Sequence, residues 1–206
     1  MPTGSQRSGS RRALKGWIQM NRRSFLGFGA AAAAAAIAPS RVLGAPASTN
    51  PGARKAPERV LSFFNTHTGE RLKTVYCCGG EYQPAALDAI NHILRDFRAN
   101  EVKPIDPRLL DLLHELGGTL ETDRPFHVIS GYRSPHTNAM LRQRSAGQTG
   151  VASRSLHMVG KAIDIRLPGV KLDHLRGAAR SLKLGGVGYY PSSNFVHVDT
   201  GRVRFW

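Results

Sequence analysis

The stretch from Ser155 to Asp164 constrains the fold most, because it sets a histidine, His157, and a carboxylate seven residues apart on either side of a glycine. After that glycine, apolar residues recur at every second position, which is typical of a β-strand with one face in the core. Ile163 and Ile165 are then predicted to enter the core. Asp164, which lies between them, is predicted to point from the opposite face of the sheet.

A second stretch, near the end of the printed sequence, repeats this alternation. Val196 and Val198 are predicted to face inward, which leaves Phe195, His197 and Asp199 together on the other face of a strand. If the two strands belong to one sheet, its polar face collects two imidazoles and at least one carboxylate.

His157, Asp164 and His197 are therefore the candidate metal ligands. Two neutral imidazoles and one carboxylate, with a fourth position left to water, form a catalytic rather than a structural zinc site. The sequence predicts Zn²⁺ as the cofactor, and it indicates no organic cofactor.

The order Ser-x-His-x-x-Gly-x-Ala-x-Asp, followed by a late Phe-Val-His-Val-Asp, resembles the zinc D-alanyl-D-alanine carboxypeptidase family. Relatives in that family include D-Ala-D-Ala dipeptidases and murein endopeptidases. The resemblance covers about residues 59–206 and extends to a branch exported with twin-arginine signals. It implies a zinc metallopeptidase that hydrolyses amide bonds in peptidoglycan peptides during cell-wall remodelling, as an endopeptidase or a carboxypeptidase.

The loop Ser130-Gly-Tyr-Arg133-Ser follows a predicted strand at residues 126–129. The family carries an arginine in a matching loop, so the resemblance implies that Arg133 faces the substrate and stabilises negative charge. A planar guanidinium suits a carboxylate or a developing oxyanion. A surface ion pair is the alternative role for this side chain.

The sequence departs from the family where relatives keep a general base, an acid three residues before the last ligand or a histidine two before it. Asn194 and Phe195 occupy those positions here. Asp199 is the nearest substitute, either as a general base or as a hydrogen-bond partner that fixes the tautomer of His197. The second role is favoured.

The missing base keeps two other functions open. One is a catalytically silent, zinc-stabilised envelope binding module, as in the Hedgehog signalling domain, which resembles these peptidases. The other is a structural α+β protein without a metal. The resemblance favours the enzyme over both.

The first 47 residues are predicted to be a basic head and a twin-arginine signal peptide. Arg22 and Arg23 precede an apolar run at residues 25–38, and Ala45-Pro-Ala47 is a candidate cleavage site. The run is too short to span a bilayer. We expect export to the periplasm or cell envelope and no transmembrane segment after signal removal, and Met20 is an alternative start.

The net charge of the protein fits a location in the periplasm or cell envelope. The whole chain carries a net charge of +15, and removing the seven basic residues of the first 47 leaves 22 basic against 14 acidic ones, a net charge of +8. A basic protein is attracted to an anionic envelope. The basic residues are spread along the chain rather than clustered with aromatic ones, so we predict peptidoglycan peptides as partners and no nucleic acid. We expect a monomer.

Residues 48–58 are predicted to be a linker, and residues 59–206 a single α+β domain. We expect a small, mainly antiparallel sheet that carries the metal ligands on one face and helices on the other. The predicted helices include one from Pro84 to Asn100, one that starts at Pro107 and one from Leu172 to Leu182. A last strand is expected from Arg202 to Trp206.

Overall fold

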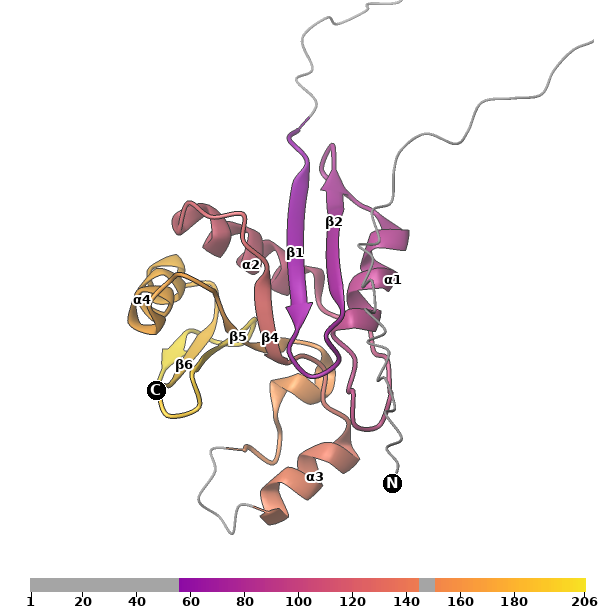
Figure 1. Cartoon of the computed structure of the whole chain (residues 1–206), viewed down its shortest axis with the longest axis vertical. Coiled ribbons are helices and arrows are strands. Elements are labelled where there is room, and N and C mark those ends of the chain that lie inside the picture. The colour runs from indigo at the N-terminus through magenta and orange to yellow at the C-terminus, as the bar shows by residue number, and fades with distance from the viewer. Residues whose placement is uncertain (1–55, 145–150) are drawn as a thin grey trace, which may run out of the picture.

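An eight-stranded mixed sheet organises the residues that this computed structural model describes, 56–144 and 151–206 (Figure 1). The strand order is β3-β2-β1-β4-β5-β7-β6-β8. Pairing is antiparallel except between β1 and β4 and between β6 and β8. The predicted α+β class and mainly antiparallel sheet are confirmed. The structure also contains two parallel strand pairs, which the sequence analysis did not specify. The strands are β1 (Arg59–Asn65), β2 (Arg71–Cys78), β3 (Glu81–Tyr82), β4 (Phe126–Ser130), β5 (Ala162–Arg166), β6 (Gly186–Tyr190), β7 (Phe195–Asp199) and β8 (Arg204–Phe205).

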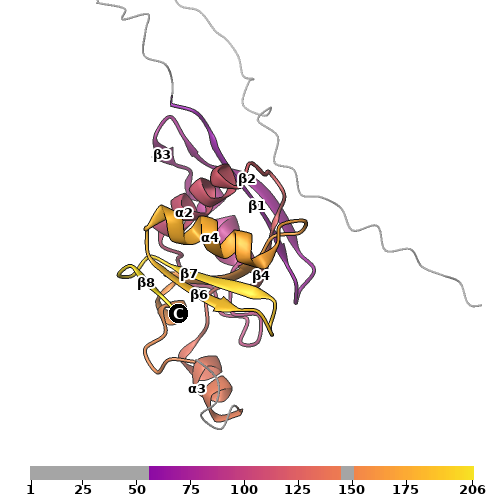
Figure 2. The same cartoon turned by 90° about the vertical axis from the view of Figure 1, so that its left-hand side faces the viewer.

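Three helices pack around the apolar core of the sheet: α1 (Pro84–Ile93), α2 (Pro107–Thr119) and α4 (Leu172–Leu182). A fourth, α3 (Pro135–Arg144), lies apart from them at the lower end of the molecule in both views (Figures 1 and 2). The leucines that α2 presents at helical spacing are buried together with Ile163, Ile165, Val196 and Val198. The core therefore occupies the apolar faces of β5 and β7, as their alternation predicts.

The helix α1 ends seven residues earlier than predicted, at Ile93 rather than Asn100. Asp96 explains the early end, because its carboxylate accepts hydrogen bonds from the backbone N–H groups of Arg98 and Ala99 and so stabilises a turn in place of a helix. Phe97 consequently leaves the helical face on which its spacing would place it. Residues 95–101 form a loop instead.

The last strand is also shorter than predicted. It is limited to β8, which pairs in parallel with β6 through Gly186 and Val187.

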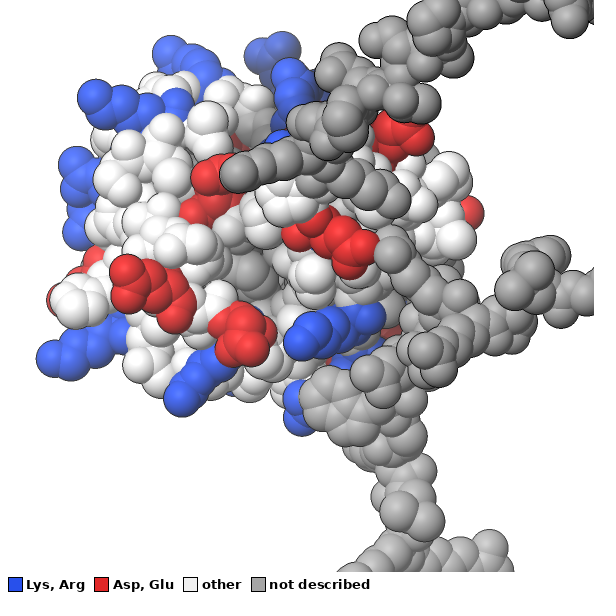
Figure 3. All heavy atoms as spheres, turned by 90° about the horizontal axis from the view of Figure 1, so that it is seen from above, with Lys and Arg blue, Asp and Glu red and all other residues white. Residues whose placement is uncertain are grey.

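Charges of both signs are interspersed over the described residues on the face seen from above in Figure 3. This face is the end of the molecule at which β1 begins, opposite to α3. None of the helices described here has the length and apolar character needed to cross a membrane.

Candidate metal centre

Two of the candidate ligands are direct neighbours across a strand pair. Asp164 of β5 is paired with His197 of β7, and His197 Nδ1 lies 2.8 Å from Asp164 Oδ1. Both side chains leave the sheet on the face opposite to the core isoleucines and valines. The strand parity predicted from the sequence therefore places them correctly.

The third candidate comes from a separate element, the 3₁₀ helix η1 (Leu156–Val159). The Ser155 hydroxyl caps this helix by accepting a hydrogen bond from the His157 N–H, and Gly160 ends it in the left-handed region at φ 66°. A Cβ at Gly160 would also collide with the Pro104 carbonyl oxygen, so the position needs a glycine for two reasons. This turn delivers His157 to the face of β5 and β7 that carries Asp164 and His197.

The three side chains meet through one atom each. His157 Nε2 lies 3.2 Å from Asp164 Oδ1 and 3.2 Å from His197 Nδ1. His157 is 3%, Asp164 6% and His197 9% exposed. Ligands held tetrahedrally at about 2.0–2.1 Å from a common zinc ion lie about 3.3 Å apart, so the spacing of these atoms suits that ion.

The other nitrogen of each imidazole is occupied. His157 Nδ1 lies 2.7 Å from the Gly131 carbonyl oxygen, which is an acceptor, and His197 Nε2 lies 3.0 Å from Asp199 Oδ2. Each ring therefore carries its proton on the outer nitrogen and turns a lone pair inward. Two lone pairs and a carboxylate oxygen then face one another, and such a set of acceptors requires a cation among them.

In the metal-free protein that cation is a proton. Burial alone would lower the pKa of His197. The hydrogen bonds and charges of Asp164 and Asp199 outweigh this effect and raise the pKa to about 9. Burial would raise the pKa of Asp164, but the two imidazoles hold it well below its usual range. The centre thus stabilises positive charge strongly.

Asp199 lies on the far side of the His197 ring from the other candidate ligands and is fully buried. Its Oδ2 accepts from His197 and, at 2.7 Å, from Arg204, while its Oδ1 accepts from Arg204 and from the backbone N–H groups of Gly186 and Gly201. Burial would raise the pKa of Asp199, but these donors hold it well below its usual range. A carboxylate bound by five donors is suited to fixing a ring rather than to taking protons from water.

Arg133 borders the centre on the side of Asp164, with its NH2 3.5 Å from Asp164 Oδ2. The turn that carries it is fixed by two contacts: the Arg133 N–H donates to the His157 carbonyl oxygen, and a Cβ at Gly131 would collide with the Leu94 carbonyl oxygen. Arg133 is 9% exposed, and its Nε has no hydrogen-bond partner among the described residues. Burial lowers the pKa of Arg133, and the nearby charge of Arg98 lowers it further, whereas Asp164 opposes both.

Two further side chains near the centre were not predicted. The Trp206 ring lies 5.4 Å from the His197 ring, and its Nε1–H donates to the Tyr190 hydroxyl. Arg98 reaches the neighbourhood of Arg133 from the loop after α1. Asn194, at the position where relatives keep an acid, lies exposed in the turn between β6 and β7.

The structure therefore brings together all five predicted site residues: His157, Asp164, His197, Arg133 and Asp199. It does so through four separate segments of chain. Their roles as metal ligands or catalytic groups stay predictions.

Comparison with known families gives this arrangement a context. Residues 53–206 match a family model described as peptidoglycan L,D-endopeptidase MepK. The chain belongs to this family. It is 45% identical to the peptidoglycan L,D-endopeptidase MepK of Escherichia coli (strain K12) over 186 residues. The alignment covers 90% of this chain and 97% of the relative.

The similarity extends to a second genus. A probable peptidoglycan L,D-endopeptidase MepK of Haemophilus influenzae (strain ATCC 51907 / DSM 11121 / KW20 / Rd) is 41% identical over 191 residues, 92% of this chain and 97% of the relative. The predicted membership in the zinc D-alanyl-D-alanine carboxypeptidase group, in its murein peptidase branch, is confirmed by these matches.

Residues 19–39 match a model of the twin-arginine translocation signal sequence. The predicted export to the periplasm or cell envelope is thereby confirmed. The residues concerned lie outside those that the structure describes, and the boundaries at residues 47 and 58 stay predictions.

Proposed function

We propose that this protein is a zinc-dependent endopeptidase that hydrolyses L,D amide bonds in peptidoglycan peptides. The observation that carries the proposal is the set of three buried acceptor atoms on His157, Asp164 and His197, which face one another within 3.2 Å. The names of the relatives support both the substrate class and the type of bond. They also favour an enzyme over a catalytically silent envelope binding module.

In this proposal, zinc is held by His157 Nε2, His197 Nδ1 and a carboxylate oxygen of Asp164. A bound zinc ion supplies Lewis acidity toward an amide carbonyl and activates water near neutral pH. The outer contacts of the two imidazoles support this assignment, since Gly131 and Asp199 hold both rings in the tautomer that a metal ligand needs.

Arg133 and Asp199 have different roles in this proposal. Arg133 lies beside the centre with an unpartnered donor, so it can hydrogen-bond a carbonyl oxygen of the substrate and stabilise the negative charge that develops there. Asp199 acts through His197 as a positioning residue, because all of its contacts hold it away from the space between the ligands.

Digestion of purified peptidoglycan tests the proposal. Mature protein loaded with zinc should release the products of L,D cleavage, which mass spectrometry of the soluble peptides identifies, and His157→Ala should release none. Asp111→Asn is a matched control, because Asp111 is a carboxylate that binds Arg59 and two tyrosines outside the centre. Intact L,D bonds after incubation with zinc-loaded protein would reject the proposed activity.

A further inference from the structure

A tryptophan borders the candidate metal centre on the side of β6. The strand order β5-β7-β6 places His197 between two direct neighbours, Asp164 on β5 and Gly188 on β6. The Trp206 indole lies over Gly188, because a Cβ at that glycine would come within 2.7–2.8 Å of three atoms of the indole. Gly188 therefore leaves room for the indole beside the His197 ring, at a distance of 5.4 Å between the ring centres.

Trp206 is held in place through its backbone and through its ring. Its carbonyl oxygen accepts a hydrogen bond from the Tyr189 N–H at 3.0 Å, and its own N–H donates to the Val187 carbonyl oxygen at 3.2 Å. The Arg204 guanidinium lies 4.8 Å from the centre of the indole ring. The indole thus has a fixed position although the residue is exposed to solvent.

The indole N–H fixes the hydroxyl oxygen of Tyr190. Trp206 Nε1 donates a hydrogen bond to this oxygen at 2.8 Å. The Tyr190 ring is also fixed, because it stacks on Phe195, its partner across β6 and β7, with ring centres 4.6 Å apart and 22° between the ring planes. Ring and oxygen are therefore both held, and only the O–H bond of the phenol remains free to rotate.

The Tyr190 hydroxyl keeps its own proton for another partner. An indole nitrogen is a donor only, so Trp206 cannot accept that proton. Within the part of the chain that the structure describes, no other group accepts a hydrogen bond from the Tyr190 hydroxyl. Tyr190 is half-buried, and a ligand bound at the centre can supply the acceptor.

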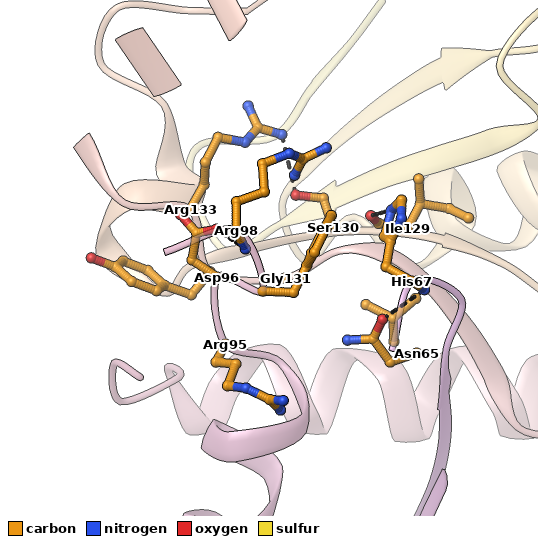
Figure 4. A pocket seen from close by; sticks show the side chains of 12 residues that line it. Asn65, His67, Arg95, Asp96, Arg98, Ile129, Ser130, Gly131 and Arg133 are labelled. Atoms are coloured by element: carbon orange, nitrogen blue, oxygen red, sulfur yellow. Dashed lines mark hydrogen bonds between the residues drawn. The ribbon is translucent and has the colours of Figure 1, made fainter. Parts of the chain in front are cut away.

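Tyr190 and Arg133 approach the same centre from two sides. Arg133 lies on the side of β5, with its NH2 3.5 Å from Asp164 Oδ2, and Figure 4 shows its guanidinium beside the Ser130 hydroxyl. Tyr190 lies on the side of β6. Burial lowers the pKa of Arg133, whereas a negative charge on the Tyr190 oxygen would raise it, so the two side chains are close enough to interact. One substrate group at the centre can therefore meet donors from both sides.

We propose that Tyr190 is a catalytic residue that donates a hydrogen bond to the carbonyl oxygen of the L,D amide bond, and that Trp206 is the positioning residue that orients it. This inference rests on the proposed endopeptidase function. Negative charge develops on the carbonyl oxygen as the amide is attacked, so a donor fixed in advance stabilises the transition state more than the ground state. The phenol keeps its proton throughout, and no covalent bond to it forms or breaks.

The test replaces Tyr190 with phenylalanine, which removes the hydroxyl and keeps the ring that stacks on Phe195. Tyr189→Phe is the matched control, because the Tyr189 ring packs against the apolar core and under the Arg176 guanidinium. The zinc-loaded mature protein and both variants are compared on a synthetic wall peptide with one L,D amide bond. They are also compared on its phosphinate analogue, in which a tetrahedral phosphorus with two oxygens replaces the reacting carbonyl. The zinc Kd and the Tm of each protein are measured as well.

We expect Tyr190→Phe to lower kcat by about 10–100-fold at unchanged KM, zinc Kd and Tm, because the lost hydrogen bond forms to a charged oxygen in the transition state. The Kd for the phosphinate should rise by about the same factor. Tyr189→Phe should match the wild type in every measurement. Trp206→Phe, which keeps a ring and removes the N–H, should lower kcat less at saturating zinc, and it should have no further effect when combined with Tyr190→Phe.

A wild-type kcat in Tyr190→Phe would overturn the inference, as would a loss carried by KM alone or a loss that excess zinc restores. Losses that add in the double variant would remove Trp206 as the positioning residue. If the wild type cuts no L,D bond, the proposed function fails. The phosphinate then decides the inference separately: weaker binding by Tyr190→Phe than by Tyr189→Phe supports it, and equal Kd values, or no binding by either protein, overturn it.

Discussion

Replacing Asp199 with asparagine separates the two roles that the sequence leaves open for this residue. The amide has two orientations in the site. With its NH2 in place of Oδ1, it would oppose the N–H groups of Gly186 and Gly201 and one nitrogen of Arg204. Each unsatisfied buried donor costs about 1–3 kcal/mol, so this orientation is unfavourable.

In the other orientation the amide oxygen keeps those three donors. The NH2 group then opposes only one donor, the Arg204 nitrogen that lies 2.7 Å from Oδ2, and it faces His197 Nε2. The imidazole can accept that hydrogen bond only if its proton moves to Nδ1, the atom that lies 2.8 Å from Asp164. A ligand nitrogen that carries a proton must lose it before it binds a metal. We therefore expect Asp199→Asn to weaken zinc affinity by roughly 10–100-fold, which corresponds to about 1.4–2.7 kcal/mol.

Competition with a chromogenic chelator measures the zinc Kd, and peptide hydrolysis is then followed at rising zinc concentration. Activity should return in large part when zinc is in excess. Asp111→Asn, which changes a carboxylate network away from the centre, should keep the wild-type Kd. An unchanged Kd together with a fall of about 10²–10⁴-fold in kcat at saturating zinc would refute the reasoning, because that pattern identifies a general base.

Three other predictions concern the metal, the pH dependence and the export of the protein. Elemental analysis should find one zinc per mature chain and none in His157→Ala; full zinc content in that variant would remove His157 from the ligand set. In metal-stripped protein, the folded-state pKa of His197 is about 9, above its unfolded value near 6.5. The stability that this group contributes is complete below about pH 6.5 and is lost as the pH rises through 9, so calorimetry should show a falling Tm over that range, and a constant Tm would contradict it. Replacing Arg22 and Arg23 with lysine should retain the precursor in the cytoplasm on fractionation, and normal export in a strain without the twin-arginine translocase would show that the signal is misassigned.

Much of the centre is predictable because strand parity is a local property of the sequence. Alternation in two short stretches is sufficient to place Asp164, His197 and Asp199 on one face, and the structure pairs the first two directly. The turn at Gly160 is predictable for a similar reason, since it combines a glycine with a capping serine.

Arg98 and Trp206 are not predictable in this way, because their positions depend on contacts between distant segments. Helical spacing through Phe97 hides the turn that Asp96 stabilises, and the same carboxylate accepts a hydrogen bond from the N–H of Ser134, 38 residues further along the chain. Trp206 reaches His197 only because β8 joins β6 in parallel, and no local pattern indicates that pairing.

The direct pairing of Asp164 with His197 also has a consequence for folding. A slip of one residue between β5 and β7 would turn one strand's ligand toward the helices and bring a core valine or isoleucine to the polar face. Such a molecule could not gather three ligands. Zinc bound per chain after refolding therefore counts the fraction of molecules in the native register, and a spectroscopic metal such as cobalt in place of zinc would report strand pairing in real time.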